Sequence, residues 1–246
     1  MQIIKRLLIA AAIIVGILLI ASGWYGYKMY TETSVMHPEK TKEIVSGIYS
    51  VKDSFVNMYI IKNGSSFIAV DSGISMGNVR KEIEGLKIDP DKVTEVLLTH
   101  TDSDHTASLK LFKNAKVYIS NEEAQMVNGK TARAMFIMKN SIKAPYKTVR
   151  DGEILDFKGM KVKGIFTPGH TPGSMSYLVD DKYLFTGDTL SLKDQKAQHF
   201  NEFFNMDTAT EEKSIKKLAG LTGVKYIFTG HYGYTDDFEK AMESWK

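Results

Sequence analysis

The sequence predicts an α/β fold in which two β-sheets pack face to face and helices cover their outer sides. Apolar, β-prone runs and amphipathic helical segments follow one another in two successive sets along the chain, which is typical of such a layered domain. The chain has 246 residues, of which 43% are hydrophobic and 25% charged, so it can form one large domain with a buried core. We place this domain at residues 43–246 and see no second folded domain.

The first set of elements contains a hairpin signal and an amphipathic helix. Asn63 and Gly64 predict a two-residue turn between two strands, and residues 77–86 carry apolar side chains at helical spacing. We expect strands over 43–51, 55–61, 67–70, 93–98 and 116–119. We expect helices over 77–86, 107–112 and 122–127.

The second set contains more hairpins and two closing helices. Thr208 followed three residues later by Glu211 is a capping box, which predicts a helix that ends near Gly220. We expect strands over 153–157, 160–166, 175–179, 182–185 and 224–228, and a last helix over 236–245. Residues 129–147 show no clear period, and we interpret them either as a loop or helix at the mouth of a site or as methionines that fill gaps in the core.

Residues 1–30 form a separate segment with the composition of a membrane span. Residues 7–24 contain no charge and follow Lys5 and Arg6. About 18 helical residues extend roughly 27 Å, which suffices to cross the apolar core of a bilayer. Basic residues before the span favour a cytoplasmic amino terminus, so we predict a membrane anchor, a linker over 31–42 and an extracytoplasmic domain. A cleaved signal peptide is the alternative, because residues 21–23 are small, and the domain would then be secreted.

Charge and cysteine content exclude several functional classes. The 32 basic and 29 acidic residues give a net charge of +3 without a long basic run, so nucleic-acid binding is not indicated. The chain has no cysteine, which excludes disulfides, thiolate ligands and a cysteine nucleophile. A small-molecule substrate and a membrane are the expected partners.

Four candidate metal ligands follow the apolar run that ends at Thr99. They are His100, Asp102, Asp104 and His105. Alternate residues of an extended segment point to the same side, so the first three share one face while the fourth turns inward as a helix begins. Aspartates that cap a helix are the alternative interpretation. Imidazole and carboxylate groups at this spacing indicate a metal site on a loop.

Three later segments each place a histidine or aspartate after a glycine, at the end of a β-type run. These residues are His170, Asp188 and His231. Together with the first motif and with Asp71, they resemble the metallo-β-lactamase superfamily over about residues 43–233. The resemblance implies an αββα sandwich. One position departs from the family pattern, because Asp102 stands where the family usually has its second histidine.

The resemblance also implies two divalent metal ions and assigns their ligands. It places one ion on His100, Asp102 and His170, and a second on Asp104, His105 and His231. It makes Asp188 the bridging ligand and Asp104 the catalytic residue. The remaining histidines, His37 and His199, have no motif around them, and we expect both to face solvent.

The carboxylate of Asp102 bears on the choice of metal. It neutralises positive charge and is a harder ligand than imidazole. Compared with the usual ligand set, this donor set therefore shifts the metal preference from zinc toward iron or manganese. We expect zinc, with iron or manganese as alternatives. A further alternative is that Asp102 weakens the first site, so that only one ion is held tightly.

The predicted function is a metallo-hydrolase. A metal-bound water would cleave an ester, thioester, lactone or lactam, the last being the reaction of a β-lactamase. The alternative from another class is a diiron redox or sensing module, since the flavodiiron pattern also has an acidic residue at the place of Asp102. A non-catalytic, membrane-tethered binding protein is disfavoured, because all seven ligand positions hold suitable donors.

Overall fold

The computed structural model describes residues 2–133 and 139–246, which form two separate units. The first unit ends at Met36 and contains one helix, α1 (Gln2–Ser34), which is long and apolar enough to cross a membrane. The helix continues to Ser34, into the segment predicted as a linker, and an i,i+4 ion pair of 2.7 Å between Lys28 and Glu32 spans the predicted boundary. The second unit runs from His37 to Lys246.

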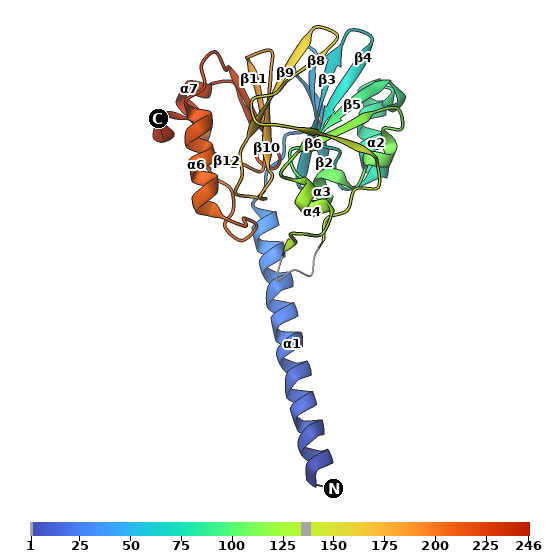
Figure 1. The fold of residues 1–246 in the computed structure, drawn as a ribbon, viewed down its shortest axis with the longest axis vertical. Helices are drawn as coiled ribbons and strands as arrows, with labels where there is room; N and C mark the ends of the chain where they lie inside the picture. Colours follow the sequence, from blue (N-terminus) through green and yellow to red (C-terminus); the bar gives the residue numbers. More distant parts are fainter. Residues whose placement is uncertain (1, 134–138) are drawn as a thin grey trace. The chain divides into compact units, whose positions relative to one another are not determined.

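The second unit contains two mixed β-sheets (Figure 1). Among the described residues, the first sheet has seven strands in chain order: β1 (Lys42–Val45), β2 (Ile48–Asp53), β3 (Val56–Asn63), β4 (Ser66–Val70), β5 (Val93–Leu97), β6 (Lys116–Ser120) and β7 (Tyr146–Val149). Strands β1 to β4 are antiparallel, and β4 to β7 are parallel. The predicted hairpin is confirmed, but its two-residue turn lies one position later than expected. Asn63 is the last residue of β3 and pairs with Ser66, so Gly64 and Ser65 form the turn.

The second sheet is built from the later part of the chain. Among the described residues its order is β15 (Tyr234–Thr235), β14 (Tyr226–Thr229), β11 (Tyr183–Gly187), β10 (Met175–Val179), β9 (Met160–Phe166) and β8 (Ile154–Phe157). Strands β11 and β14 are parallel, and the other neighbours are antiparallel. A separate hairpin joins β12 (Leu190–Lys193) to β13 (Lys196–His199).

Helices cover the outer faces of both sheets, and the expected αββα sandwich is confirmed (Figure 1). Helix α2 (Met76–Gly85) packs on the first sheet, and α6 (Thr208–Ala219) and α7 (Phe238–Ala241) pack on the second. The remaining helical turns are η1 (Pro90–Lys92), α3 (Ser103–Thr106), η2 (Leu109–Leu111), α4 (Ala124–Val127) and η3 (Glu243–Trp245). Between the sheets the buried rings of Tyr59, Phe185 and Phe228 form the aromatic centre of the core.

Two turns were missed in the sequence, so one predicted strand is in fact a hairpin and one hairpin was not predicted. The strand expected over 43–51 is a hairpin of β1 and β2, turning at Gly47, whose φ of 81° only glycine adopts readily. The hairpin of β12 and β13 was not predicted at all. Its turn residues Asp194 and Gln195 have φ values of 51° and 63°, although they lack the glycine that normally indicates such a turn.

Two helix predictions also need correction. The helix expected over 107–112 begins earlier, as α3, and is followed by the separate turn η2, so the first motif itself supplies the helical residues. The prediction of a capping box formed by Thr208 and Glu211 is wrong. The N-cap of α6 is Asp207, which accepts a hydrogen bond from Thr210 N at 3.0 Å, while Glu211 is fully buried and points into the protein.

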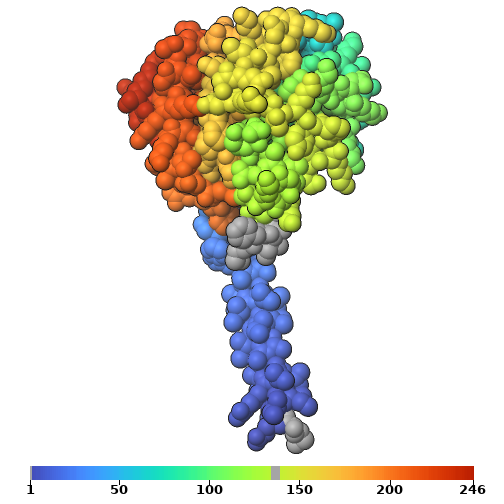
Figure 2. All heavy atoms as spheres, viewed as in Figure 1, coloured from blue at the N-terminus to red at the C-terminus, as the bar shows by residue number. Residues whose placement is uncertain are grey.

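The predicted site residues all follow carboxyl ends of strands at one edge of the sandwich. They come after β5, β9, β11 and β14, and backbone hydrogen bonds join the two sheets at this edge. Met175 N donates to Thr99 O at 2.8 Å, and Asn57 N donates to Gly230 O at 2.7 Å. On the face drawn in Figure 2, green to yellow-green segments from the first half border orange segments from the second.

Candidate metal centre

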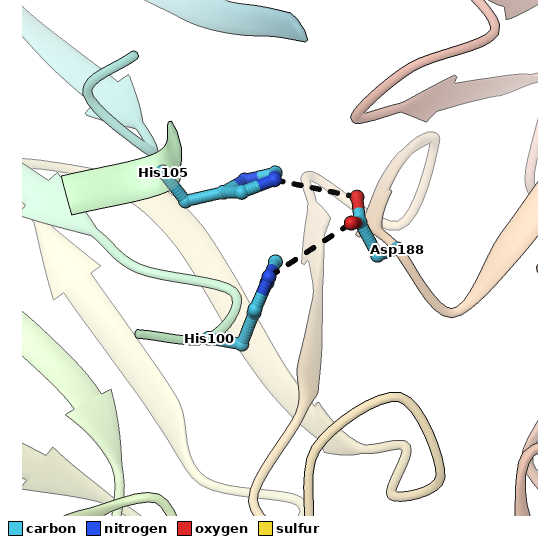
Figure 3. Close-up of side chains that lie close together, drawn as sticks. All are labelled: His100, His105 and Asp188. Carbon is cyan, nitrogen blue, oxygen red and sulfur yellow. Dashed lines mark ion pairs between the residues drawn. The ribbon is translucent and has the colours of Figure 1, made fainter. Parts of the chain in front are cut away.

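The structure brings all seven predicted ligands into one cluster around Asp188. This carboxylate follows β11 and lies opposite His100 and His105, whose rings point toward it from the loop after β5 and from α3 (Figure 3). Asp188 Oδ2 lies 3.1 Å from His231 Nε2, 3.4 Å from His170 Nε2 and 3.9 Å from His100 Nε2. Asp188 Oδ1 lies 3.4 Å from His105 Nε2. The cluster therefore has a central carboxylate within reach of four imidazoles.

Two sets of three donors flank Asp188, and each is compact enough for one ion. In the first set, Asp102 Oδ2 lies 3.5 Å from His100 Nε2 and 3.2 Å from His170 Nε2. In the second, Asp104 Oδ2 lies 3.4 Å from His231 Nε2 and 3.6 Å from His105 Nε2. These are the two groupings that the sequence resemblance implied.

The outer nitrogen of each histidine in the cluster has a hydrogen-bond partner. His231 Nδ1 donates to Phe55 O at 2.7 Å, and His170 Nδ1 donates to Asn205 Oδ1 at 3.2 Å. His105 Nδ1 donates to Asp71 Oδ2 at 2.9 Å, and His100 Nδ1 lies 3.1 Å from Thr99 Oγ1. Such bonds fix the tautomer that leaves Nε2 free to bind a metal ion.

Asp71, which the sequence resemblance included, links two of these histidines. Its Oδ1 accepts a hydrogen bond from Thr99 N at 2.8 Å, and its Oδ2 accepts from Thr99 Oγ1 at 2.9 Å. Because the Thr99 hydroxyl donates to Asp71, its oxygen accepts from His100 Nδ1. Asp71 itself has a positive φ of 62°, a conformation that aspartate tolerates better than most residues.

The donor atoms that face the centre fit a divalent cation. Within the described parts of the chain, His100 Nε2 and Asp188 Oδ1 are buried without a hydrogen-bond partner. Burial opposes ionisation of Asp188, yet the imidazoles of His231 and His105 hold its pKa well below the usual range. Burial likewise disfavours the charged form of His105, but the carboxylates of Asp188 and Asp104 raise its pKa well above the ordinary value. A cation placed among these groups would compensate the carboxylates and use the unpaired nitrogen lone pair.

Arg133 and Asn140 belong to the site, although no sequence motif indicated them. Arg133 Nε donates to Asp102 Oδ1 at 2.8 Å, and Asn140 Nδ2 donates to the same oxygen at 3.0 Å. Two described residues of the segment 129–147 thus contact the site, which agrees with one of the two interpretations. Met135 and Met138 lie outside the described residues.

Two buried carboxylates support the loops that carry the histidines. Glu123 Oε1 accepts hydrogen bonds from Thr101 N and Oγ1 at 2.8 and 2.7 Å, while its Oε2 accepts from Thr171 Oγ1 at 2.7 Å. It therefore joins the loop of His100 to the loop of His170. Burial raises the pKa of Glu123. No sequence motif indicated this role for Glu123, since its partners lie on loops that are remote in the chain.

Glu211 supports His170 from the other side. Its Oε2 accepts hydrogen bonds from Phe200 N at 2.9 Å and from Asn205 Nδ2 at 2.7 Å, and Asn205 in turn accepts from His170. Burial raises the pKa of Glu211 to about 8. His37 is exposed, as expected, whereas His199 is only partly exposed, with 36% of its side chain accessible and Nδ1 donating to Phe200 O at 2.7 Å.

Fold and site together define an αββα protein with a buried centre of histidines and aspartates that suits divalent metal ions. Residues 51–231 match the sequence profile of the metallo-beta-lactamase superfamily, and the chain belongs to this superfamily. The resemblance read from the motifs is thereby confirmed.

Individual relatives are similar to this chain at modest identity. The lactamase-like protein nscB of Neosartorya fischeri is 28% identical over 193 residues, which cover 77% of this chain and 52% of that protein. The probable polyketide biosynthesis zinc-dependent hydrolase BaeB of Bacillus velezensis is 32% identical over 137 residues, 54% of each chain. The chain thus spans about half the length of these curated relatives. A metallo-beta-lactamase family protein of Thermus thermophilus has a similar fold, with a TM-score of 0.63 and 20% identity over 82% of this chain and 79% of that one.

Proposed function

We propose that this protein is a hydrolase that works with up to two divalent metal ions. One observation carries the proposal: the Asp188 carboxylate faces the Nε2 atoms of four histidines at 3.1 to 3.9 Å, with a further carboxylate in each flanking set of donors. The name of the relative BaeB, a zinc-dependent hydrolase, supports the same reaction class. Zinc is the metal we expect, with iron or manganese as alternatives.

Bound ions would lower the pKa of a water molecule and polarise the carbonyl oxygen of the substrate. The chain's own groups then have distinct tasks. Asp188 holds the two donor sets together. Asp104 is more accessible than its neighbours, with 19% of its side chain exposed against none for His105, so we assign its Oδ2 to orient the attacking water and take its proton. No side-chain nucleophile is needed, which agrees with the absence of cysteine.

Aromatic rings beside the centre favour a substrate with an apolar part. The ring of Phe55 stacks on His231 with centroids 5.7 Å apart, and the ring of Phe200 lies 5.0 Å from His170 and 5.5 Å from His231. Phe204 lies next to Phe200, at 6.2 Å. Phe200 is itself buried, whereas Phe55 and Phe204 are partly exposed. Partly exposed rings can bind apolar groups, so we propose an ester, thioester, lactone or lactam with an apolar acyl portion as substrate.

The test combines metal analysis with a substrate panel. The full chain, purified in a mild detergent, is assayed for bound metal by mass spectrometry and for hydrolysis of an ester, a thioester, a lactone and a β-lactam. Removal of metal with a chelator should abolish hydrolysis, and zinc should restore it. The variant His199→Ala serves as a control, since this histidine lies outside the donor set. Hydrolysis that survives in chelated, metal-free protein would contradict the proposal.

A second candidate function is a diiron redox or sensing centre. The observation that favours it is the position of Asp102 within the first donor set, because added carboxylate oxygens suit iron better than imidazole alone does. An oxidised diiron centre absorbs visible light and a dizinc centre does not. Colour in protein purified from iron-supplied cells, together with bound iron in place of zinc, would support this candidate.

The composition of α1 supports a proposed membrane anchor, with the second unit outside the cytoplasm. The lack of native cysteine makes this easy to test. A single cysteine at the exposed Ser65, introduced as Ser65→Cys, should react with a membrane-impermeant maleimide in intact cells. Labelling only after lysis would place the unit in the cytoplasm, and labelled protein in the medium would indicate a cleaved signal.

A further inference from the structure

Arg133 lies where a cation would lie in the first donor set. Its Nη2 is 2.5 Å from Asp102 Oδ2 and 2.7 Å from His170 Nε2. These are two of the three atoms that the set of His100, Asp102 and His170 offers to a metal ion. The guanidinium is held in place from behind, since Nη1 donates to Phe204 O and Nε donates to Asp102 Oδ1.

The contact with His170 uses the lone pair that a metal ion would need. A guanidinium can only donate hydrogen bonds, so His170 Nε2 is the acceptor, and the ring proton is on Nδ1, which donates to Asn205. A neutral imidazole nitrogen has one lone pair. The same nitrogen therefore accepts from Arg133 or coordinates a metal ion, but not both at once. Asp102 Oδ2 and His170 Nε2 lie 3.2 Å apart, and Nη2 of Arg133 contacts both atoms.

The second donor set has no such competitor in the structure. Within residues 2–133 and 139–246, the ion-pair partners of Asp104 and Asp188 are histidines, with no lysine or arginine among them. The two halves of the centre therefore differ in a way that the donor atoms alone do not indicate.

We propose that Arg133 competes with metal for the set of His100, Asp102 and His170, so that this site binds an ion more weakly than the set of Asp104, His105 and His231. Asp102 makes the competition possible. A carboxylate binds a guanidinium through two oxygens, whereas a histidine at this position would offer no negative charge to it. In the metal-free protein the guanidinium of Arg133 thus neutralises the carboxylate of Asp102, and metal must reach a high enough concentration to displace it. This inference rests on the proposed metal-binding function.

The size of the effect follows from competition. If Arg133 occupies the site in nine of ten metal-free molecules, the apparent affinity of that site is reduced about tenfold, because only the open fraction can bind. Removing the guanidinium should therefore raise the apparent affinity of the first site by the same factor. The affinity of the second site should not change, since the hydrogen bonds and ion pairs of Arg133 within the described parts of the chain involve Asp102, His170 and Phe204 but none of the donors of that site.

The test is a zinc titration of the full chain in detergent, after removal of metal, with dissociation constants measured by competition against a chelating dye. Wild type should bind one ion tightly and a second weakly. Arg133→Gln should tighten the weaker site about tenfold or more and leave the tighter site unchanged. The control Lys139→Gln removes an exposed positive charge from the same segment and should leave both constants unchanged.

Two results would overturn the inference while leaving the proposed function intact. One is an unchanged weaker constant in Arg133→Gln, and the other is an equal gain in Lys139→Gln. A failure of every protein to bind zinc, and likewise iron or manganese in the same titration, would overturn the proposed function itself and the inference with it. Should Arg133→Gln not fold, Arg133→Lys replaces the two-pronged contact by a single point charge and should give a smaller tightening of the same site, and an unchanged constant there would overturn the inference as well.

Discussion

Replacement of Glu211 by glutamine should remove a large part of the pH dependence of stability. Glu211 is fully buried, and burial raises its pKa from 4.5 to about 8. The folded protein therefore holds a proton that the unfolded chain releases above pH 4.5. The free energy of unfolding must fall as the pH rises through this window, because the folded state binds more protons there.

The magnitude follows from the two pKa values. Each unit of difference corresponds to about 1.4 kcal/mol, so the full loss between pH 4.5 and pH 8 approaches about 5 kcal/mol, of which roughly 3 kcal/mol has accrued by pH 7. Glutamine has nearly the same shape and does not titrate. Its amide oxygen can accept the bonds from Phe200 N and Asn205 Nδ2 that Glu211 accepts now. The difference in stability between Glu211→Gln and wild type should therefore increase by roughly 3 kcal/mol, in favour of the variant, from pH 4.5 to pH 7.

The assay is urea denaturation of the metal-free chain followed by circular dichroism at several pH values. Both proteins contain the same histidines, so the difference between their unfolding free energies isolates position 211. The control Glu84→Gln changes an exposed carboxylate on α2 and should follow wild type at every pH. Parallel curves for Glu211→Gln and wild type would refute the reasoning, since they would mean that Glu211 ionises alike in the folded and unfolded states.

Three further predictions concern the centre itself. Asp188→Ala should lose more bound metal than His231→Ala, because Asp188 faces both donor sets and His231 belongs to one; equal metal contents by mass spectrometry would argue against a bridging role. Gly173→Ala should destabilise the protein by about 2 kcal/mol or more and lower its metal content, because a Cβ there would lie 2.1 Å from Glu123 N and push apart the loops that Glu123 joins; unchanged melting and metal binding would show that the backbone yields without cost. Asp102→His should move the acidic limb of the hydrolysis rate profile to lower pH, because loss of a negative charge favours the deprotonated form of the activated water; a limb that stays in place would remove the electrostatic role given to this carboxylate.

Local patterns along the chain determined the donor set and much of the fold. His100, His170, Asp188 and His231 each follow a β-type run, and strand ends with glycine turns are visible in sequence because strand periodicity and turn chemistry are properties of neighbouring residues. The parallel direction of β4 and β5, and of β11 and β14, then brings these ends to one edge. Where the local signal misled, as in the hairpin of β12 and β13, the turn residues lacked the glycine that normally reports such a turn.

The tertiary structure alone decided which side chains surround the donors. Arg133 and Glu123 stand in segments without a motif, and Glu211 was expected only as part of a capping box. Arg133 contacts Asp102 and His170, which are 31 and 37 residues away in the chain. Glu123 binds the loops of the histidines through Thr101 and Thr171, and Glu211 reaches His170 through Asn205. Such contacts depend on the packing of two sheets and on the burial that changes a carboxylate's pKa, which no periodicity along the chain encodes. The candidate ligands can therefore be recognised from local sequence patterns. The presence of Arg133 beside only one of the two donor sets, by contrast, depends on contacts between loops that are distant in the chain.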